Sequence, residues 1–343
     1  MDIQCEACKT VFKVKDGLIP AGKIVRYTCK RCRPVSGSVH ESKYSKLAPA
    51  AAIGRPGLNK PDPTMNGLTK ERVLNSIRDL PAMPQVITEI QNQMTTADIN
   101  TRKICGLIET DQAVATKVLR TANSAFYGQS GKVSTMQGAL NIIGLKGLME
   151  VVSLIGAQKL LVGVLPGYGY ETEDLWKHSL AVAYGSKLLA LDRDPAISDT
   201  AHLSGLIHDV GRIVLDRFIV EKKDEIAAFM KNEQKTFLDA ETKFFGLNHA
   251  KVAAEVCRKW KFPAVMSHAI GWHHEPSKSG EDLLAHILHM ADYLATMIGI
   301  GYDSDDVLSQ VEGGTMDFLG LKQVDLGELV SRTMESVNQA TQI

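Results

Sequence analysis

From residue 68 onward, apolar residues recur every three to four positions, which is the period of an amphipathic α-helix. Short breaks that carry Gly, Pro, Asn or Asp separate these runs, and no long alternation of period two indicates strands. The pattern therefore predicts an all-α body. The clearest runs are Val73, Ile77 and Leu80; Ile104, Leu107 and Ile108; Val114, Val118 and Leu119; and Leu140, Ile143, Leu148, Val151 and Val152.

Two stretches interrupt the helical pattern. Residues 34–66 contain five Pro with scattered Gly and Ser and no sustained period, which predicts a flexible linker. The stretch LPGYGYETED, residues 165–174, predicts a division of the body into two helical halves. The expected organisation is a small module at 1–33, the linker at 34–66, an N-terminal helical half at 67–168 and a second helical half at 169–343.

The composition is that of an ordinary soluble protein, with 44% hydrophobic and 23% charged residues in 343. The formal net charge is zero, but residues 1–46 carry ten Lys/Arg against four Asp/Glu, a net charge of +6, and the remainder carries −6. The N-terminus has no apolar signal-peptide core, and the most apolar run, VVSLIGAQKLLVGVL, is interrupted by Gln158 and Lys159. We therefore expect a cytoplasmic protein that does not enter a membrane.

Four of the six cysteines form two CxxC pairs separated by 20 residues, namely Cys5, Cys8, Cys29 and Cys32. Two such pairs supply the tetrahedral thiolate set that Zn²⁺ prefers in structural sites, and the residues between them predict two short strands around a turn. A redox or unbonded pair of CxxC motifs is the alternative. Because so short a module has too little core to fold alone, zinc binding, worth about 10 to 16 kcal/mol, would stabilise it. We expect the other two cysteines, Cys105 and Cys257, to be small buried apolar residues.

Residues 3–33 also resemble the short zinc ribbons that begin many bacterial proteins, with a CxxC, a V-x-D-x-x-IP-like stretch and a second CxxC. That resemblance implies a module that binds a partner. Its basic residues could contact nucleic acid or an acidic protein, although a solvated basic surface is an equal alternative. These residues are Lys9, Lys13, Lys15, Lys23, Arg26, Lys30, Arg31 and Arg33.

Histidines and aspartates recur on the apolar faces of the second half. In GLIHDVGR, His208 and Asp209 directly follow an apolar helical turn. His178 lies within the stripe of a helix predicted over 175–189, and Asp292 lies on the stripe of LLAHILHMADYLA. A helix predicted to begin at Asn248 carries His249 on its apolar face, and the helix in PAVMSHAIGWHHEP ends with His273 and His274. Four predicted helices thus turn His or Asp inward.

A shared cation is the simplest way to satisfy this set. Each buried imidazole or carboxylate is unfavourable unless it is matched, and separate partners for six or seven of them are a less economical hypothesis. Nitrogen and oxygen ligands suit Fe, Mn, Co, Ni or Zn ions rather than Ca²⁺, and two ions bridged by Asp209 would use the whole set. The alternative for any single member is a hydrogen-bonded core histidine. Of the remaining histidines, His268 and His289 are the best further candidates, and His40, His202 and His286 are expected to be linker, surface or supporting residues.

The order His178, His208-Asp209, Asp292 resembles the HD superfamily of metal-dependent phosphohydrolases, and His249 with His273-His274 resembles the additional ligands of its binuclear members, including the HD-GYP phosphodiesterases. Upstream, LPAMPQVITEIQ, IETDQAVATKVLRTANSAFYG and ALNIIGLKGLMEVV resemble the HDOD domain, an HD-related output domain of bacterial signalling proteins, over residues 76–295. The sequence departs from HD-GYP in three places. No GYP follows His274, Arg212 stands where a Lys follows the dyad, and Asp174 stands where a Glu ligand is usual.

The resemblance implies a regulatory output protein with a buried mononuclear or dinuclear metal site. The alternative is a metal-dependent phosphohydrolase or phosphodiesterase acting on a phosphorylated small molecule or nucleotide, with Arg212 as a candidate phosphate clamp and Asp174 as an additional ligand. A third hypothesis makes residues 1–46 a nucleic-acid reader, and a signalling protein is the expected partner otherwise. In the N-terminal half, Asn123 and Ser124 are either a ligand contact or a helix cap.

Overall fold

The computed structural model describes residues 2–4, 11–13, 70–80, 100–124, 133–299 and 311–341. The chain divides into two compact units, residues 1–55 and 56–343, and the boundary falls within the stretch predicted as a linker.

In the first unit, strand β1 (Asp2–Gln4) pairs antiparallel with β2 (Val11–Lys13), so that Ile3 lies opposite Phe12. Strand β2 lies in the stretch for which two strands are predicted, whereas its partner precedes the first CxxC pair. The four cysteines of the predicted zinc ribbon lie outside the described residues, as does the predicted linker. The ribbon and its zinc therefore stay predictions.

The second unit is all-α, as its apolar periodicity predicts. Its helices are α1 (Lys70–Arg78), α3 (Thr101–Thr110), α4 (Gln112–Ala122), α5 (Met136–Leu161), α6 (Asp174–Arg193), α7 (Ser198–Ile207), α8 (Val210–Glu221), α9 (Lys223–Glu233), α10 (Phe237–Phe245), α11 (His249–Lys259), α12 (Ala264–Trp272), α13 (Leu283–Ile298), α14 (Thr315–Phe318) and α15 (Asp325–Thr341), with short 3₁₀ turns at Pro195–Ile197 and Pro276–Ser279.

Local capping explains where several of these helices begin and end. The Asn248 side chain accepts a hydrogen bond from the backbone N–H of Lys251 at the start of α11, and Asp111 accepts from the N–H groups of Ala113 and Val114 at the start of α4. At the other end, Gly299 closes α13 in the left-handed conformation that glycine adopts most readily. Capping residues visible in the sequence therefore set these boundaries.

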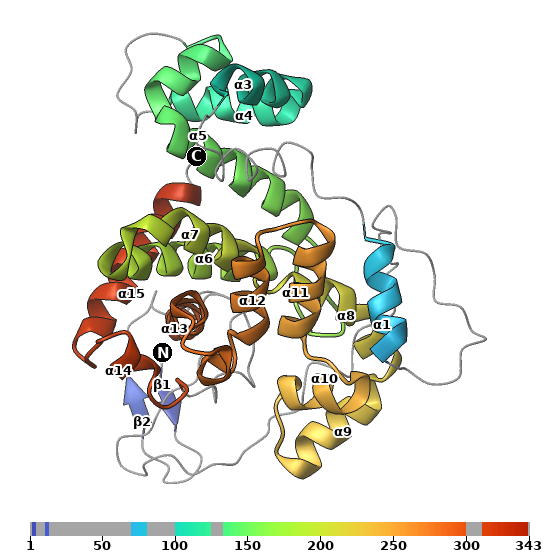
Figure 1. Cartoon of the computed structure of the whole chain (residues 1–343). Helices are drawn as coiled ribbons and strands as arrows, with labels where there is room; N and C mark the ends of the chain where they lie inside the picture. The colour runs from blue at the N-terminus through green and yellow to red at the C-terminus, as the bar shows by residue number, and fades with distance from the viewer. Residues whose placement is uncertain are drawn as a thin grey trace. The chain divides into compact units, whose positions relative to one another are not determined.

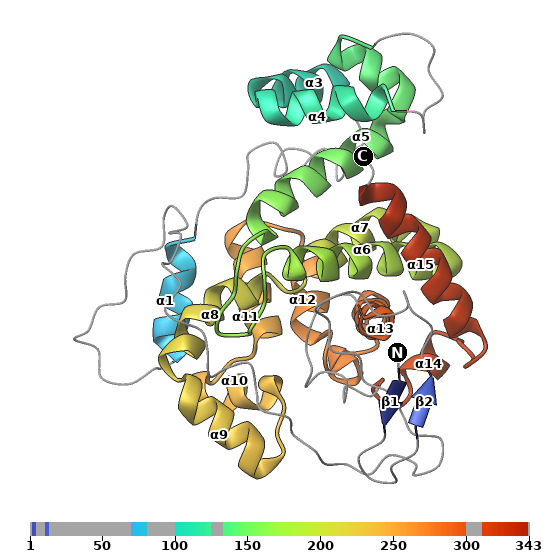
Figure 2. The same cartoon turned by 180° about the vertical axis from the view of Figure 1, so that it is seen from behind.

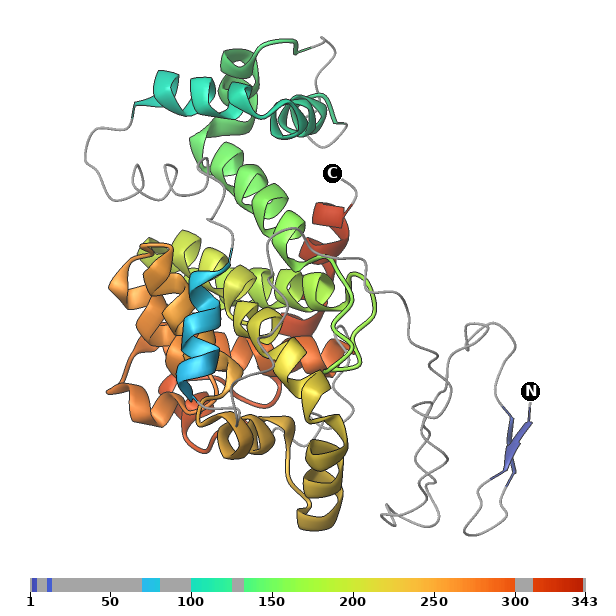
Figure 3. The same ribbon diagram turned by 90° about the vertical axis from the view of Figure 1, so that its right-hand side faces the viewer.

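The helices pack as a bundle with a smaller group at one end. Helices α3 and α4 pack on each other and on α5, and this group stands at the top of Figure 1. In the bundle, α6 packs on α7, α13 and α15, and α11 packs on α8 and α12. Figure 2 shows α13 end-on between α12 and α15. Helix α1 packs on α8 and α11, and α9 and α10 pair with each other at the far end, as Figure 3 shows.

Helix α5 is the one described helix long and apolar enough to cross a membrane by length and composition. Half of its apolar window is buried within the fold, and Gly144 interrupts the helix with a φ of 75°. It also contacts α3, α4, α6 and α7. These are the properties of a core helix. The cytoplasmic location stays a prediction.

Cys105 and Cys257 are both buried among apolar residues, which confirms the sequence prediction for them. Burial raises the pKa of the Cys257 thiol to about 12. This thiol is therefore held in its neutral, unreactive form.

Candidate metal centre

Five segments bring the predicted ligands to one place. The seven side chains are His178 in α6, His208 and Asp209 at the junction of α7 and α8, His249 at the start of α11, His273 and His274 after the last turn of α12, and Asp292 in α13. They form three overlapping trios in which the ligand atoms all lie within 4.8 Å of one another. The convergence inferred from the apolar faces is present in the fold.

Glycines allow the helices that carry these residues to approach closely. A Cβ added at Gly211 in α8 would lie 2.0 Å from the backbone oxygen of His249 in α11. A Cβ at Gly205 in α7 would lie 2.8 Å from the backbone of Ala183 in α6. Because backbone atoms cannot yield as a flexible side chain does, only glycine permits these crossings. The spacing of the ligands depends on them.

The trio of His178, His208 and Asp209 joins α6 to the α7–α8 junction, and Asp292 of α13 lies beside it. His178 Nε2 lies 3.0 Å from Asp292 Oδ1 and 3.7 Å from Asp209 Oδ2. His208 Nε2 lies 3.6 Å from Asp209 Oδ2 and 3.9 Å from Asp292 Oδ1. Two imidazole nitrogens and two carboxylate oxygens therefore surround one small volume.

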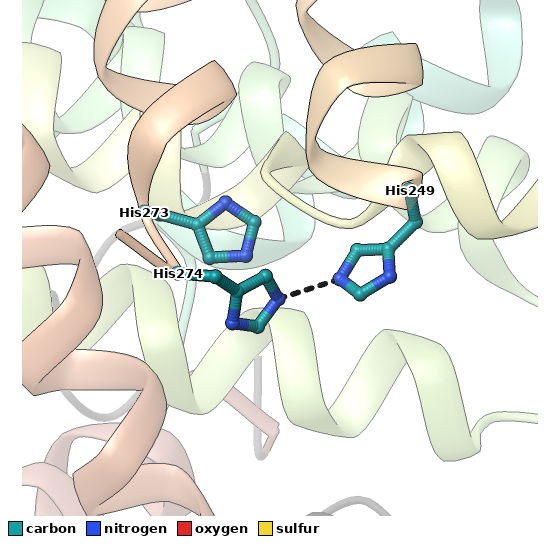
Figure 4. Close-up of side chains that lie close together, drawn as sticks. All are labelled: His249, His273 and His274. Carbon is teal, nitrogen blue, oxygen red and sulfur yellow. Dashed lines mark hydrogen bonds between the residues drawn. The ribbon is translucent and has the colours of Figure 1, made fainter. Parts of the chain in front are cut away.

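A second trio, drawn in Figure 4, consists of His249, His273 and His274. His249 Nε2 lies 2.7 Å from His274 Nε2 and 3.3 Å from Asp209 Oδ1. The two oxygens of Asp209 thus face different trios, Oδ2 toward His178 and His208 and Oδ1 toward His249. The carboxylate of Asp209 therefore lies between the two groups of histidines, and its role as a bridging ligand stays a prediction.

The ring orientations of two histidines are set by the backbone. His208 Nδ1 lies 2.7 Å from the carbonyl oxygen of Gly205, and His273 Nδ1 lies 2.7 Å from that of Ile270. A carbonyl only accepts, so each Nδ1 carries the proton and each Nε2 presents a lone pair to the centre. Both Nε2 atoms are buried without a hydrogen-bond partner, as is Asp209 Oδ1. Three unpartnered polar atoms therefore point into the same buried space, an arrangement that a cation would satisfy.

Arg212 supplies the charge that opposes Asp209. Its Nε donates a 2.8 Å hydrogen bond to Asp209 Oδ2, and its guanidinium lies over the rings of Tyr168 and Tyr170. Burial alone would raise the pKa of Asp209, but Arg212 and the surrounding imidazoles hold it well below its usual value. Asp209 is therefore ionised. Arg212 is itself only 3% exposed.

The imidazoles differ in protonation. Burial lowers the pKa of His208, and burial with the neighbouring His208 ring lowers the pKa of His273 to about 3. The pKa of His274 lies well below its ordinary value because the ring is buried and lies beside the rings of His273 and His249. Burial also acts to lower the pKa of His178, but its hydrogen bond to Asp292 and the negative charges of Asp292 and Asp209 together outweigh burial and raise that pKa. Most of the histidines are thus neutral at pH 7, the form that binds metal.

Two residues behind His249, Glu241 and Tyr168, were not predicted from the sequence. The carboxylate of Glu241 in α10 accepts from the backbone N–H of His249, lies 2.8 Å from its Nδ1, and accepts from the hydroxyl of Tyr168 at 2.6 Å. This carboxylate directs His249 Nε2 toward the centre, as carboxylates behind metal-bound histidines do. The sequence does carry one indication that Glu241 is buried. It lies between Phe237 and Phe245 on the apolar face of its helix.

The remaining residues that the sequence singled out form contacts outside the three trios. The Asp174 carboxylate accepts from the backbone N–H of Glu171, and Asp174 belongs to none of the three trios among the described residues. His289 Nδ1 donates to the carbonyl of His273, so it supports the backbone of a candidate ligand. His268 Nε2 lies 2.9 Å from the Ser279 carbonyl. Asn123 caps α4 and exchanges hydrogen bonds with the backbone of Val133, which gives it a structural role.

The donor set fits a borderline transition-metal ion. It offers neutral imidazoles and ionised carboxylates at mutual distances suited to shared ligation, with three buried ligand atoms lacking any other partner. Without a cation, His274 must donate its Nε2 proton to His249, because His249 uses its own proton toward Glu241. For His274 to bind metal through Nε2, that proton would have to move to its Nδ1, since a neutral imidazole carries its one proton on the nitrogen that does not bind the metal.

Comparison with known proteins agrees with the fold. Residues 80–276 match the family model of the HDOD domain. A protein of undetermined function from Treponema pallidum (strain Nichols) is 26% identical over 274 residues, which are 79% of this chain and 52% of that protein. The chain thus spans about half the length of this relative.

Three solved structures share the fold at lower identity. An HDOD domain protein of unknown function from Geobacter sulfurreducens has a TM-score of 0.62 at 23% identity, covering 79% of this chain and 97% of that one. A provisionally assigned phosphohydrolase from Shewanella amazonensis SB2B has a TM-score of 0.60 at 21% identity, with coverages of 79% and 97%. A provisionally assigned signal transduction protein from Marinobacter aquaeolei VT8 has a TM-score of 0.60 at 20% identity, with coverages of 78% and 60%. Since the family model matches more than half of the residues, this chain belongs to the HDOD domain family.

Proposed function

We propose that this chain is a bacterial signalling output protein whose HDOD body holds one or two transition-metal ions in a buried centre. One observation carries the proposal: seven His and Asp side chains converge, and three of their ligand atoms are buried without a hydrogen-bond partner. A buried polar atom without a partner is unfavourable, so such an arrangement persists most readily where a ligand satisfies it.

The surroundings of Asp209 favour a regulatory centre over a catalytic one. One carboxylate oxygen already accepts from Arg212, whose guanidinium lies against two buried tyrosine rings. His208, Asp209 and His273 are each at most 1% exposed. A catalytic centre keeps an open coordination position and a path for its substrate, whereas a structural or sensory centre is enclosed by side chains.

A phosphohydrolase is the second candidate, and the exposure of Asp292 favours it. Its side chain is 18% exposed while it faces both His178 and His208, so one edge of the centre reaches solvent. A metal ion bound there would activate water and polarise a phosphoryl oxygen. For Arg212 to act as the predicted phosphate clamp, its Nε would have to leave Asp209. The proteins of the same fold include both assignments, signal transduction and phosphohydrolase.

For the N-terminal module, we retain zinc held by Cys5, Cys8, Cys29 and Cys32 and a role in recruiting a signalling partner. Nucleic acid is the alternative partner, through the basic residues of 1–46. Binding that weakens steeply as salt concentration rises, and is lost on removal of residues 1–46, would support nucleic acid.

The experiment for the metal centre is metal content per chain by element-resolved mass spectrometry on the full chain. The variants are His273→Gln and Asp209→Asn, with His268→Gln as the matched histidine control outside the trios. Because the N-terminal cysteines are present in every sample, differences between samples report the HDOD body alone. We expect wild type and His268→Gln to hold one or two more metal equivalents than the other two variants. Equal metal contents in all four proteins would refute the centre.

Water accessibility separates the two functions once a metal is bound. With Mn²⁺ as the bound ion, the water-proton relaxation rate reports whether coordinated water exchanges with solvent. A water-proton relaxation rate no higher than that expected for a fully enclosed ion supports the regulatory function. A large enhancement, together with hydrolysis of bis(p-nitrophenyl) phosphate that Asp292→Asn abolishes, supports the hydrolase.

A further inference from the structure

A cavity of about 550 Å³ lies between α4, α5, α6 and α15, away from the candidate metal centre. On α6 it is lined by Trp176, Leu180 and Tyr184, whereas His178 lies on the opposite face of that helix, as the helical period requires. The volume is in the range of small-molecule sites. The cavity therefore has room for a ligand that makes no contact with the trios.

The lining combines an apolar interior with a few polar groups. Val151, Leu154 and Ile155 of α5 contribute aliphatic surface, and Trp176 adds an aromatic ring. The polar groups of the lining come from three lysines, two glutamates, two glutamines and three hydroxyl side chains, namely Lys117, Lys177, Lys187, Glu150, Glu173, Gln158, Gln339, Thr121, Ser336 and Thr341. Pockets for organic ligands usually have this division, with apolar surface for the body and a few polar groups that orient it.

Two of the three lysines are neutralised within the protein. Lys187 Nζ lies 2.5 Å from a carboxylate oxygen of Glu150, which also accepts from the Tyr184 hydroxyl at 2.9 Å. Lys177 Nζ lies 2.9 Å from a carboxylate oxygen of Glu173. Each of these lysines is neutralised by its glutamate, so neither needs a ligand anion as a counter-ion.

Lys117 is different. Its Nζ donates a 2.9 Å hydrogen bond to Oε1 of the neutral Gln158 amide, and no carboxylate among the described residues lies within ion-pair distance of it. Burial lowers the pKa of Lys117, and the like charge of the neighbouring Arg120 lowers it further. A partly buried ammonium group without a counter-ion at a cavity wall is the natural contact for a ligand anion.

The backbone at the edge of this cavity also carries strain. Glu173, which lines it, has a φ of 78°, in the left-handed region that non-glycine residues rarely adopt. Strained residues of this kind cluster at ligand sites, where the surrounding structure maintains them.

We infer that this cavity binds a small amphipathic anion, with an apolar or aromatic body against Leu154 and Trp176 and one acidic group on Lys117. The site is separate from the proposed metal function and needs no metal. Because α6 lines the cavity on one face and carries His178 on the other, a bound ligand contacts the helix that supplies a candidate metal ligand.

The probe for this site is 8-anilinonaphthalene-1-sulfonate, which has an aromatic body and one anionic group. Fluorescence titration of the full chain is expected to saturate at one equivalent. Lys117→Gln removes the charge at nearly constant size and is expected to weaken binding about tenfold, whereas Lys117→Arg keeps the charge and retains most of the affinity. Ala340→Trp, in the last turn of α15, is expected to fill the cavity and abolish binding.

Lys146→Gln is the matched control, because Lys146 lies on α5 with an 83% exposed side chain and does not line the cavity. It should leave the affinity unchanged, and circular dichroism verifies that each variant is folded. Equal affinities for wild type, Lys117→Gln and Ala340→Trp would overturn the proposal. So would an equal loss of affinity in Lys146→Gln and Lys117→Gln, because that result indicates general surface charge.

Discussion

His208 and His273 face each other edge-to-face with ring centroids 5.0 Å apart, and each donates its Nδ1 proton to the backbone carbonyl three residues earlier. Both Nε2 atoms therefore present lone pairs to the same buried space without a partner. Two such lone pairs repel each other, and a shared cation would turn that repulsion into attraction. Metal-free protein should accordingly be less stable than metal-bound protein.

The first prediction concerns this pair. His273→Gln should abolish the rise in melting temperature that Mn²⁺, Co²⁺ or Zn²⁺ produces in the wild type. At a free metal concentration of 100 times Kd, linkage predicts a stabilisation of about 2.7 kcal/mol for the wild type. In chelator the variant should melt within a few degrees of the wild type, since it loses an imidazole nitrogen that had no partner. Differential scanning calorimetry with and without metal measures both quantities. An equal metal-induced rise in both proteins would contradict the prediction.

A second prediction tests Glu241 as the support of His249. Glu241→Gln should weaken metal binding about 10- to 100-fold, because the amide orients and polarises the imidazole less strongly than the carboxylate. Tyr168→Phe removes only the hydroxyl that donates to Glu241 and should lower the free energy of unfolding by about 1.5–3 kcal/mol. Calorimetric metal titration and urea unfolding measure the two effects. Unaltered metal affinity in Glu241→Gln would remove Glu241 from the support of the centre.

Gly211 provides a geometric test. Gly211→Ala places a Cβ 2.0 Å from the His249 carbonyl, so α8 and α11 must separate and Asp209 moves relative to His249. We expect a loss of stability of about 3 kcal/mol or more, together with loss of bound metal. Gly106→Ala is the control, because a Cβ there meets nothing within 4 Å and alanine favours the helix, which predicts a small gain in stability. If Gly211→Ala were as stable and as metal-rich as the control, the described crossing of α8 and α11 would be wrong.

The fourth prediction concerns pH and a histidine outside the centre. Burial lowers the pKa of His202 to about 4, while its ring packs edge-on against Tyr184. Since the unfolded chain takes up this proton near pH 6.5 and the folded chain near pH 4, the contribution of His202 to stability is complete above pH 6.5. It declines as pH falls toward 4, by on the order of 3 kcal/mol. His202→Phe should therefore flatten the fall in unfolding free energy between pH 6.5 and 4. Urea denaturation across that range provides the measurement, and parallel pH profiles for the two proteins would exclude this role for His202.

Local sequence patterns determined the helices of this protein and the members of its candidate centre. Asn248 caps α11 and His249 opens it, as the polar residue before the apolar run predicts. His178 and Asp292 face inward because the helical period places them on apolar stripes. Helix capping and the inward face of a helix depend on residues within one or two turns, so they can be predicted from the sequence without knowledge of the fold. The zinc ribbon, Asp174 as a ligand and the partners stay predictions.

Tertiary structure alone decided how these pieces meet. Tyr168 and Glu241 are 73 residues apart, and only the packing of the chain unites them behind His249. Likewise, α1 packs on α8 and α11, which lie far from it in the sequence. The cavity beside Lys117 of α4 is bounded on one side by α15. Contacts of this kind depend on which helix faces fit together, and close crossings such as that at Gly211 leave no periodic signal in the sequence. The ligand types are therefore a local property of this chain, and the geometry that joins them is a global one.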